Sequence, residues 1–201
     1  MINRELYMEQ ITPFIDKPFV KVITGIRRCG KSVVLRLIRE ELLRRGVSED
    51  YIIYMNFESF EWIDMKEAKA LYAHIREATK APGKYYILLD EIQEVTDWEK
   101  AVNAFLVDLD VDIYVTGSNS RLLSSEFSTY LAGRYVAFHI MTLSFREYLL
   151  FHDLPLTISV SDRKTEFLKY LRMGGFPAIH TANYDYNACL LYTSPSPRDC
   201  S

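Results

Sequence analysis

A short run near the start of the chain combines two glycines, a lysine and a serine at a fixed spacing. Gly25 and Gly30 enclose four residues, and Lys31 and Ser32 follow directly. Glycines let the backbone turn so that successive N–H groups point at phosphate oxygens, aided by the dipole of a following helix. The lysine can reach the β- and γ-phosphates, and the serine hydroxyl can bind Mg²⁺. We therefore predict an ATP-binding loop formed by Gly25, Ile26, Arg27, Arg28, Cys29, Gly30, Lys31, Ser32 and Val33.

Three side chains inside this loop allow more than one interpretation. Arg27 and Arg28 can face the phosphates or the solvent. Cys29 fits a small loop residue better than a nucleophile.

The other cysteines, Cys189 and Cys200, give no disulfide or metal-binding spacing, so a reducing cytoplasmic location is expected. The four histidines show no ligand spacing, so the expected metal is Mg²⁺ bound with the nucleotide.

A pair of carboxylates supplies the second part of a nucleotide site. Asp90 and Glu91 follow an almost wholly apolar run, residues 85–89, which predicts a buried strand. Asp90 is placed to hold Mg²⁺, and Glu91 to orient and deprotonate the attacking water. An ordinary polar strand end is the alternative, which the loop upstream disfavours. The pair is typical of ATPases with a catalytic glutamate and disfavours small-molecule kinases, while the absence of an Asn-Lys-x-Asp sequence disfavours GTP.

Two further polar positions are candidates for catalysis. Asn119 follows a fourth apolar run and can hold the attacking water or sense the γ-phosphate, although Ser118 competes for that role. Asn119 can instead cap the next helix. Arg134 precedes the fifth apolar run, where it can reach the γ-phosphate of a neighbouring subunit or pair with a surface carboxylate. The predicted catalytic residues are therefore Glu91, Asn119 and Arg134, with Ser32 and Asp90 at the metal.

The spacing of apolar residues predicts the elements that position these side chains. Strands are expected at residues 19–24, 51–57, 85–89, 111–115 and 135–141, and helices at residues 3–15, 31–45, 65–79, 98–109, 121–131 and 165–171. Thr96 and Ser144 each begin a capping-box sequence. Strands that alternate with helices in this way predict a three-layer α/β domain with a mainly parallel five-stranded sheet.

The candidate residues are expected to meet at one edge of this sheet. Gly25, Asp90 and Asn119 each follow a predicted strand. Parallel α/β sheets bind ligands outside the carboxyl ends of their strands. We expect Arg134 at the same edge, so that the four residues enclose one ATP-hydrolysing site.

The composition limits the partners of this 201-residue chain. Hydrophobic residues make up 49% and charged residues 25%, as in soluble globular domains, and the net charge of −3 disfavours a globally basic surface for nucleic acid. The sequence has no run of about 18 apolar residues and no signal-peptide pattern, so we expect no membrane partner. The predicted helix after the loop mixes both charge signs, which indicates a solvated face rather than a DNA-binding patch. Its charged residues are Arg36, Arg39, Glu40, Glu41, Arg44 and Arg45.

Several short sequences accompany the loop. They are Thr24 to Ser32 with its Arg27-Arg28 pair, Leu89-Asp90-Glu91-Ile92-Gln93, Thr116-Gly117-Ser118, Leu131-Ala132-Gly133-Arg134, Leu143 to Tyr148 and Gly174-Gly175-Phe176-Pro177. With these motifs the chain resembles the prokaryotic AAA-type ATP-binding proteins that carry a C-terminal domain of unknown function. That family often has serine where Cys29 stands and proline where Thr142 stands, and neither difference removes a group that the chemistry needs.

The resemblance covers nearly all of residues 1–188. It implies an AAA+ P-loop NTPase core of the type with a catalytic glutamate, bound ATP and Mg²⁺, and a downstream domain that binds a partner. We expect residues 1–150 to form the core with its N-terminal helix, and residues 151–188 to begin a truncated C-terminal lid or partner region. Residues 189–201 resemble a translated sequencing-adapter sequence, an interpretation favoured over a disordered Ser/Pro-rich tail. The native sequence is then expected to stop near Ala188.

The expected function is Mg²⁺-dependent ATP hydrolysis coupled to an unknown conformational or partner-remodelling task. The expected partners are the nucleotide, further copies of the chain through Arg134, and an unknown protein or nucleic acid bound by the missing C-terminal domain. One alternative is an interaction module gated by nucleotide without significant turnover. Another is a nucleic-acid-remodelling ATPase, which the net charge of −3 weakens.

Overall fold

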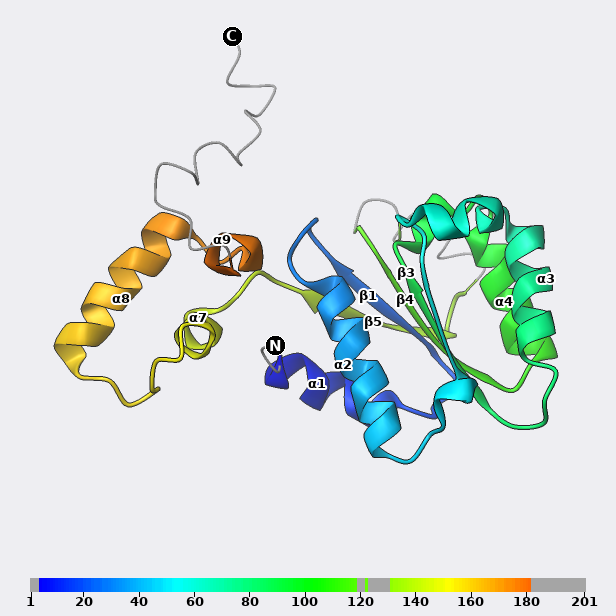
Figure 1. The fold of residues 1–201 in the computed structure, drawn as a ribbon, viewed down its shortest axis with the longest axis horizontal. Coiled ribbons are helices and arrows are strands. Elements are labelled where there is room, and N and C mark those ends of the chain that lie inside the picture. The colour runs from blue at the N-terminus through cyan, green and yellow to red at the C-terminus, as the bar shows by residue number, and fades with distance from the viewer. Residues whose placement is uncertain (1–3, 119–121, 123–130, 182–201) are drawn as a thin grey trace, which may run out of the picture. The chain divides into compact units, whose positions relative to one another are not determined.

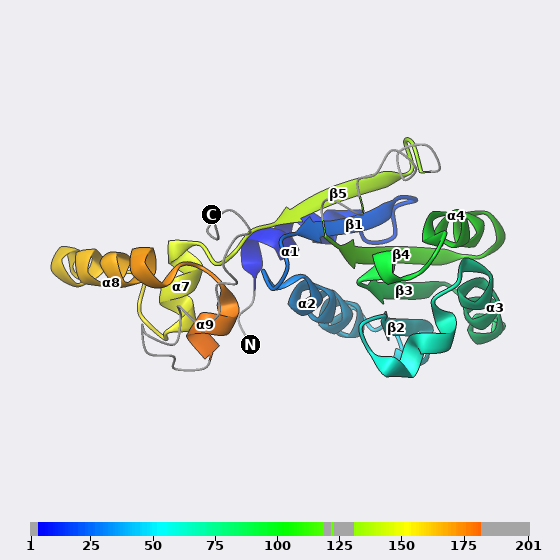
Figure 2. The same ribbon diagram turned by 90° about the horizontal axis from the view of Figure 1, so that it is seen from above.

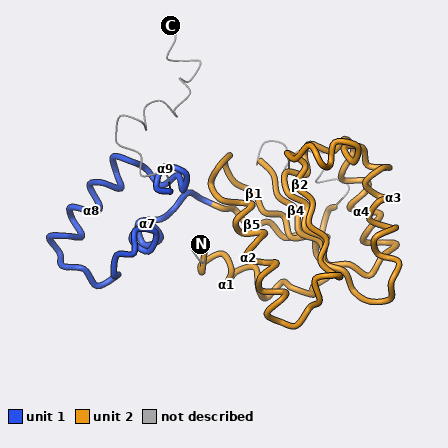
Figure 3. Tube along the Cα trace, viewed as in Figure 1, with its two compact units in different colours: residues 1–2, 141–201 blue, residues 3–140 orange. Residues whose placement is uncertain are grey.

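The computed structural model describes residues 4–118, residue 122 and residues 131–181. The chain divides into two compact units, one of residues 3–140 and one that contains residues 141–181 (Figure 3). Each unit is described separately below.

A five-stranded sheet forms the centre of the larger unit. Its strands are β1 Val20–Gly25, β2 Ile52–Asn56, β3 Tyr85–Asp90, β4 Val111–Gly117 and β5 Tyr135–Ile140. They lie in the order β2-β3-β4-β1-β5, and every neighbouring pair is parallel (Figure 2). All residues of β1 and β3 are buried, as expected for strands covered on both faces. The predicted parallel five-stranded sheet is therefore confirmed.

Helices cover both faces of this sheet and make three layers (Figure 1). Alternate residues of a strand point to opposite faces. The helices are α1 Glu5–Ile11, α2 Lys31–Arg44, α3 Ala68–Ala78 and α4 Trp98–Asp108. In β3, Ile87 and Leu89 pack with side chains of α3 and α4, whereas Tyr86 and Leu88 pack with side chains of α1 and α2.

Short 3-10 helices interrupt or precede several elements. They are η1 Thr12–Phe14, η2 Glu49–Tyr51, η3 Phe60–Met65 and η4 Ile92–Glu94. The helix predicted over residues 3–15 becomes α1 and then η1, with Pro13 in the first turn of η1. The helix predicted over residues 65–79 begins later, at Ala68. The helix predicted over residues 121–131 falls almost entirely outside the described residues.

The predicted capping box at Thr96 is wrong. The N-cap of α4 is Asp97, which has a left-handed backbone with φ 56° and makes no side-chain capping bond. Thr96 is instead held by the segment before α3, because its N–H donates to the Lys66 carbonyl and its own carbonyl accepts from the Ala68 N–H. These backbone bonds tie Thr96 to the segment before α3, and α4 begins at Trp98, one residue later than the capping-box sequence predicts. The capping box at Ser144 is confirmed, with both reciprocal bonds to Glu147 present.

The smaller unit is helical in its described part. It contains α7 Phe145–Phe151, α8 Val160–Met173 and α9 Pro177–Thr181. Rings of α7 and α8 pack edge to face, as Phe145 does with Phe167 at 5.1 Å between ring centroids. The helix predicted over residues 165–171 is part of the longer α8. Across the described ranges no helix combines the length and the apolar composition that a membrane span requires.

A buried ion pair lies near the amino ends of β1 and β4. The Lys21 ammonium bonds to Asp112 Oδ1 and to the Lys17 carbonyl, and both charged side chains are almost fully buried. The second oxygen of Asp112 accepts bonds from the Tyr114 hydroxyl, at 2.9 Å, and from the Asp16 N–H, at 2.8 Å. The pair therefore fixes the segment between η1 and β1 to the central strands.

Two histidines of the smaller unit form a chain of hydrogen bonds. His180 Nε2 lies 2.7 Å from the Gly174 carbonyl oxygen, so it must donate there. His180 Nδ1 then accepts from His152 Nε2, at 3.2 Å. Burial lowers the pKa of His180 below its ordinary 6.5.

We expect acid to destabilise this unit through His180. Between its lowered pKa and 6.5 the unfolded chain binds the proton more readily, so stability is lost as the pH falls through that window. Amide hydrogen-exchange protection in α8 should fall several-fold from pH 7.5 to pH 5.5. The loss should be smaller in His180→Gln, and an equal loss in both proteins would contradict this prediction.

Candidate functional site

The predicted phosphate-binding loop connects β1 to α2. Only glycine fits at Gly25, because an added Cβ would lie 2.4 Å from the Ile140 carbonyl oxygen and 2.7 Å from Cys29 Sγ. Gly30 has φ 108° and is the N-cap of α2, a left-handed conformation that glycine adopts readily. The loop therefore has the strand-to-helix context that its motif requires.

The side chains inside the loop have different surroundings. Cys29 is fully buried, and burial raises the pKa of its thiol, which disfavours a reactive thiolate. The Cys29 carbonyl accepts a bond from Arg4 at 3.3 Å. The exposed Arg27 pairs with Glu58, at 3.3 Å between Nη2 and Oε1. These contacts favour a structural interpretation of Cys29, and they show Arg27 facing a carboxylate.

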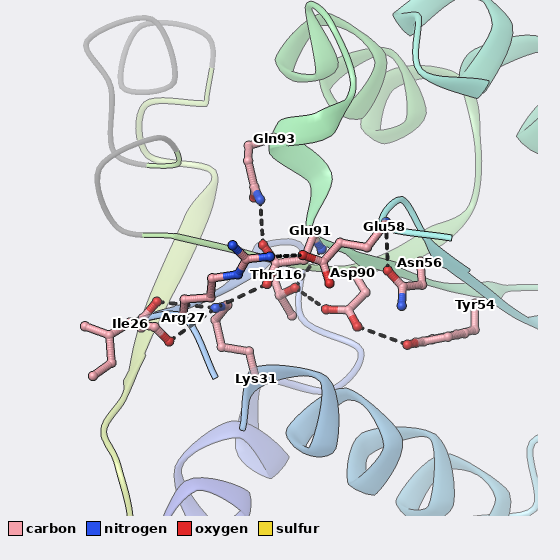
Figure 4. A network of polar contacts seen from close by, with 11 residues as sticks. Ile26, Arg27, Lys31, Tyr54, Asn56, Glu58, Asp90, Glu91, Gln93 and Thr116 are labelled. Atoms are coloured by element: carbon pink, nitrogen blue, oxygen red, sulfur yellow. Dashed lines mark hydrogen bonds and ion pairs between the residues drawn. The ribbon is translucent and has the colours of Figure 1, made fainter. Parts of the chain in front are cut away.

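Lys31 lies buried at the centre of the site (Figure 4). Its ammonium nitrogen is 3.2 Å from Glu91 Oε1, 3.4 Å from the Gly25 carbonyl oxygen and 3.5 Å from the Ile26 carbonyl oxygen. The Lys31 ammonium group, which can reach nucleotide phosphates, is thus paired with the carboxylate of Glu91, the residue directly after β3. A nucleotide that recruits Lys31 has to compete with Glu91.

Asp90 ends β3 and is fully buried. One of its carboxylate oxygens accepts a bond from the Thr116 hydroxyl at 2.5 Å, and the other accepts one from the Tyr54 hydroxyl at 3.0 Å (Figure 4). Burial beside Asp90 raises the pKa of Tyr54, which keeps this hydroxyl protonated as a donor. Two neighbouring strands therefore fix the orientation of the Asp90 carboxylate.

Glu91 leaves the sheet in a left-handed conformation, with φ 55° and ψ 49°. Its N–H donates to the Thr116 hydroxyl at 2.9 Å, so one hydroxyl holds both acidic residues. Its carboxylate accepts a bond from Gln93 Nε2 at 2.5 Å and pairs with Lys31 through the other oxygen. A non-glycine residue in this conformation stores strain that its surroundings must offset.

Sequence reasoning missed the contacts of Tyr54 and Thr116. Thr116 belongs to the motif Thr116-Gly117-Ser118, which does not indicate that its hydroxyl bonds to Asp90 and to the Glu91 N–H. Tyr54 carried no signal, since a tyrosine in an apolar strand is usually a core residue. The register of β2 on β3, which pairs Tyr54 with Leu88, brings its ring within reach of Asp90.

Ser32 and Asp90 have the donor chemistry that Mg²⁺ prefers. Hydroxyl and carboxylate oxygens suit this hard cation, and each Asp90 oxygen keeps a lone pair beyond its one hydrogen bond. Over the described ranges, no three His, Cys, Asp or Glu side chains gather into a metal-binding group. Ser32 and Asp90 could each supply one oxygen ligand to a Mg²⁺ ion that arrives with the nucleotide.

The expected position of Arg134 is wrong. Arg134 precedes β5, and its carbonyl accepts a bond from the N–H of Val20, the first residue of β1. It therefore lies at the amino ends of the parallel strands, whereas Gly25 and Asp90 lie at their carboxyl ends. Its guanidinium donates to Asn103 at 3.1 Å. Action on a neighbouring subunit stays a prediction.

The structure brings together part of the predicted set. Lys31, Asp90 and Glu91 meet at the carboxyl edge of the sheet beside the loop. Ser118 is half-buried at the end of β4, and its carbonyl accepts a bond from the Leu122 N–H. Asn119 lies outside the described residues, so its predicted role has no structural test.

Comparison with known protein families finds that the sequence model described as an AAA domain matches residues 17–149 of this chain. The chain belongs to this AAA family. The match contains all five strands, the loop and the acidic pair of β3. An AAA-type P-loop protein is thus established, as the motifs indicated.

Two curated relatives extend this family assignment. An uncharacterized protein of Haemophilus influenzae is 43% identical over 186 residues, covering 91% of this chain and 46% of the relative. An uncharacterized protein of Methanocaldococcus jannaschii is 35% identical over 184 residues, covering 89% of this chain and 39% of the relative. The chain therefore spans less than half the length of these relatives.

Two solved structures share the fold. AMPPCP-bound DnaA from Aquifex aeolicus gives a TM-score of 0.57 at 15% identity and covers 97% of this chain and 63% of DnaA. Cdc6p from Pyrobaculum aerophilum gives a TM-score of 0.51 at 13% identity, covering 81% of this chain and 49% of that protein. The larger unit accordingly has the α/β P-loop NTPase fold.

Proposed function

We propose that this AAA chain binds ATP with Mg²⁺ and hydrolyses the bond between the β- and γ-phosphates of ATP. The observation that carries the proposal is the buried contact between Lys31 and Glu91, next to the oriented carboxylate of Asp90. A cation that can bind phosphate, a carboxylate that can hold a metal and a second carboxylate that can act as a base lie within one site. P-loop ATPases use these three groups for phosphoryl transfer to water.

The loop amides and Lys31 would hold the phosphates in this reaction. Lys31 must leave Glu91 to reach them, and this frees Glu91 Oε1 to accept a proton from the attacking water. Mg²⁺, held through Ser32 and Asp90, would neutralise charge that develops on the phosphate oxygens. Thr116 keeps both acidic residues in register during this exchange.

The test is steady-state ATP hydrolysis by Glu91→Gln. The variant keeps the shape of the side chain and removes the base, so turnover should fall at least about 100-fold, as for the loss of a general base. ATP affinity should rise, because the uncharged amide no longer pairs with Lys31. The matched control is Glu77→Gln on the exposed surface of α3, which should hydrolyse ATP like the wild type.

Equal turnover of Glu91→Gln and wild type would contradict the assigned base. Tight ATP binding by a wild type that never hydrolyses ATP would instead favour a nucleotide-gated interaction module. The Lys31–Glu91 pair supports that second candidate, since nucleotide binding must rearrange it whether or not turnover follows. The task that either cycle drives is a matter for the whole protein, because the chain covers less than half the length of the two curated relatives.

A further inference from the structure

Gln93 contacts the proposed base from the side opposite Lys31. It lies in η4, two residues after Glu91, and its Nε2 donates to Glu91 Oε2 at 2.5 Å (Figure 4). Lys31 contacts the other carboxylate oxygen, Oε1, at 3.2 Å. The two oxygens of Glu91 therefore have different partners.

The side-chain amide of Gln93 is oriented so that its NH₂ group bonds to the Glu91 carboxylate, while its own oxygen bonds to no donor of the described residues. Gln93 Oε1 is buried, and among the described residues no donor bonds to it. An ionised carboxylate accepts hydrogen bonds only, so the NH₂ group has to face Glu91 and the amide oxygen is left in its buried position. A buried acceptor without a partner is unfavourable, and such arrangements persist at functional positions.

Gly117 provides the space for this amide. A Cβ at Gly117 would lie 2.1 Å from Gln93 Oε1 and 2.7 Å from the Leu122 side chain. Gly117 ends β4 directly after Thr116, which bonds to Asp90 and to the Glu91 N–H. The end of β4 thus supports the backbone of Glu91 through Thr116 and its carboxylate through Gln93.

We propose that Gln93 is a positioning residue, which holds Glu91 Oε2 when nucleotide phosphates draw Lys31 away. This inference rests on the proposed ATPase function. The bond from Gln93 leaves Oε1, the oxygen that Lys31 releases, as the atom that takes the proton from water. Gln93 touches neither nucleotide nor water in this role.

The decisive variant is Gln93→Met, which has a similar length and no donor. Its kcat should fall about 10-fold, in line with the loss of one hydrogen bond to a charged group, while its KM for ATP stays within about twofold. The matched control, Gln10→Met on the exposed surface of α1, should keep wild-type kcat. An unchanged kcat in Gln93→Met, or a raised KM at unchanged kcat, would overturn the proposal.

A second variant, Gln93→Glu, separates positioning from packing. Its side chain has the same size, but near pH 8 two carboxylates repel each other and the donor is lost. At lower pH the introduced carboxyl group can bind a proton and donate a hydrogen bond to Glu91. The kcat of the variant divided by that of the wild type should therefore rise as the pH is lowered from 8 to 6. If this kcat ratio does not change between pH 8 and pH 6, the proposal is overturned. The test with Gln93→Glu still decides the matter if Gln93→Met proves poorly folded.

A third measurement needs no turnover. The side-chain amide resonances of Gln93, assigned by their absence in Gln93→Met, should move in Glu91→Gln without nucleotide. Unmoved resonances would overturn the Gln93–Glu91 contact whatever the hydrolysis assays show. An inactive wild type would instead contradict the ATPase proposal, and with it the role of this contact in catalysis.

Discussion

Replacing Lys31 by methionine should weaken ATP binding about 100-fold. The ammonium group is buried, and besides Glu91 its contacts are the carbonyl oxygens of Gly25 and Ile26, so it is already inside the loop that phosphates would enter. Truncating one partner of a buried charge pair lowers affinity by about 2–5 kcal/mol, and about 2.7 kcal/mol corresponds to 100-fold. Titration calorimetry with Mg²⁺ and ATP measures this directly.

The matched control for Lys31→Met is Lys69→Met, which removes an exposed lysine of α3. Its ATP affinity should equal that of the wild type. The melting temperature of Lys31→Met must also be recorded, because the variant leaves Glu91 without its cation. A folded Lys31→Met that binds ATP as tightly as the wild type would remove the loop from the nucleotide site.

Replacing Asp112 by alanine should lower the free energy of unfolding by about 3–5 kcal/mol, the usual effect of breaking a buried ion pair. The change leaves the Lys21 ammonium buried without its carboxylate. It also removes the acceptor of the Tyr114 hydroxyl and of the Asp16 N–H. Urea unfolding of the wild type and the variant measures this difference, provided that the unfolding free energy depends on urea concentration with the same slope in both proteins.

Two variants define the origin of that loss. Asp110→Ala removes an exposed carboxylate two residues away and should change stability by less than about 0.5 kcal/mol. The double variant Lys21→Met with Asp112→Leu replaces both charges by apolar groups and should recover much of the stability. If Asp112→Ala unfolds at the wild-type urea concentration, the ion pair contributes nothing to the fold.

The strands and the loop could be predicted from sequence because their signals are local. Residues 85–89 form a continuous apolar run, and the glycines at both ends of the loop mark its turn. The position of Arg134 follows from strand direction alone, because a residue before a parallel strand lies at the opposite edge from a residue after one.

The remaining contacts depend on pairings between distant segments. Tyr54 reaches Asp90 through the register of β2 on β3, which no local pattern specifies. Thr96 has the sequence of a cap but is bound by the segment before α3. Gln93 belongs to the motif Leu89-Asp90-Glu91-Ile92-Gln93, but its bond to Glu91 depends on the space that Gly117 leaves beside it in the fold.

The left-handed backbone of Glu91 has a consequence for how this sequence can change. A glycine there would relax the chain, since glycine adopts φ 55° without steric penalty. The same substitution deletes the proposed base. Selection for a more stable protein and selection for a working one therefore push this position in opposite directions, and a stability screen run without an activity assay would enrich inactive variants here.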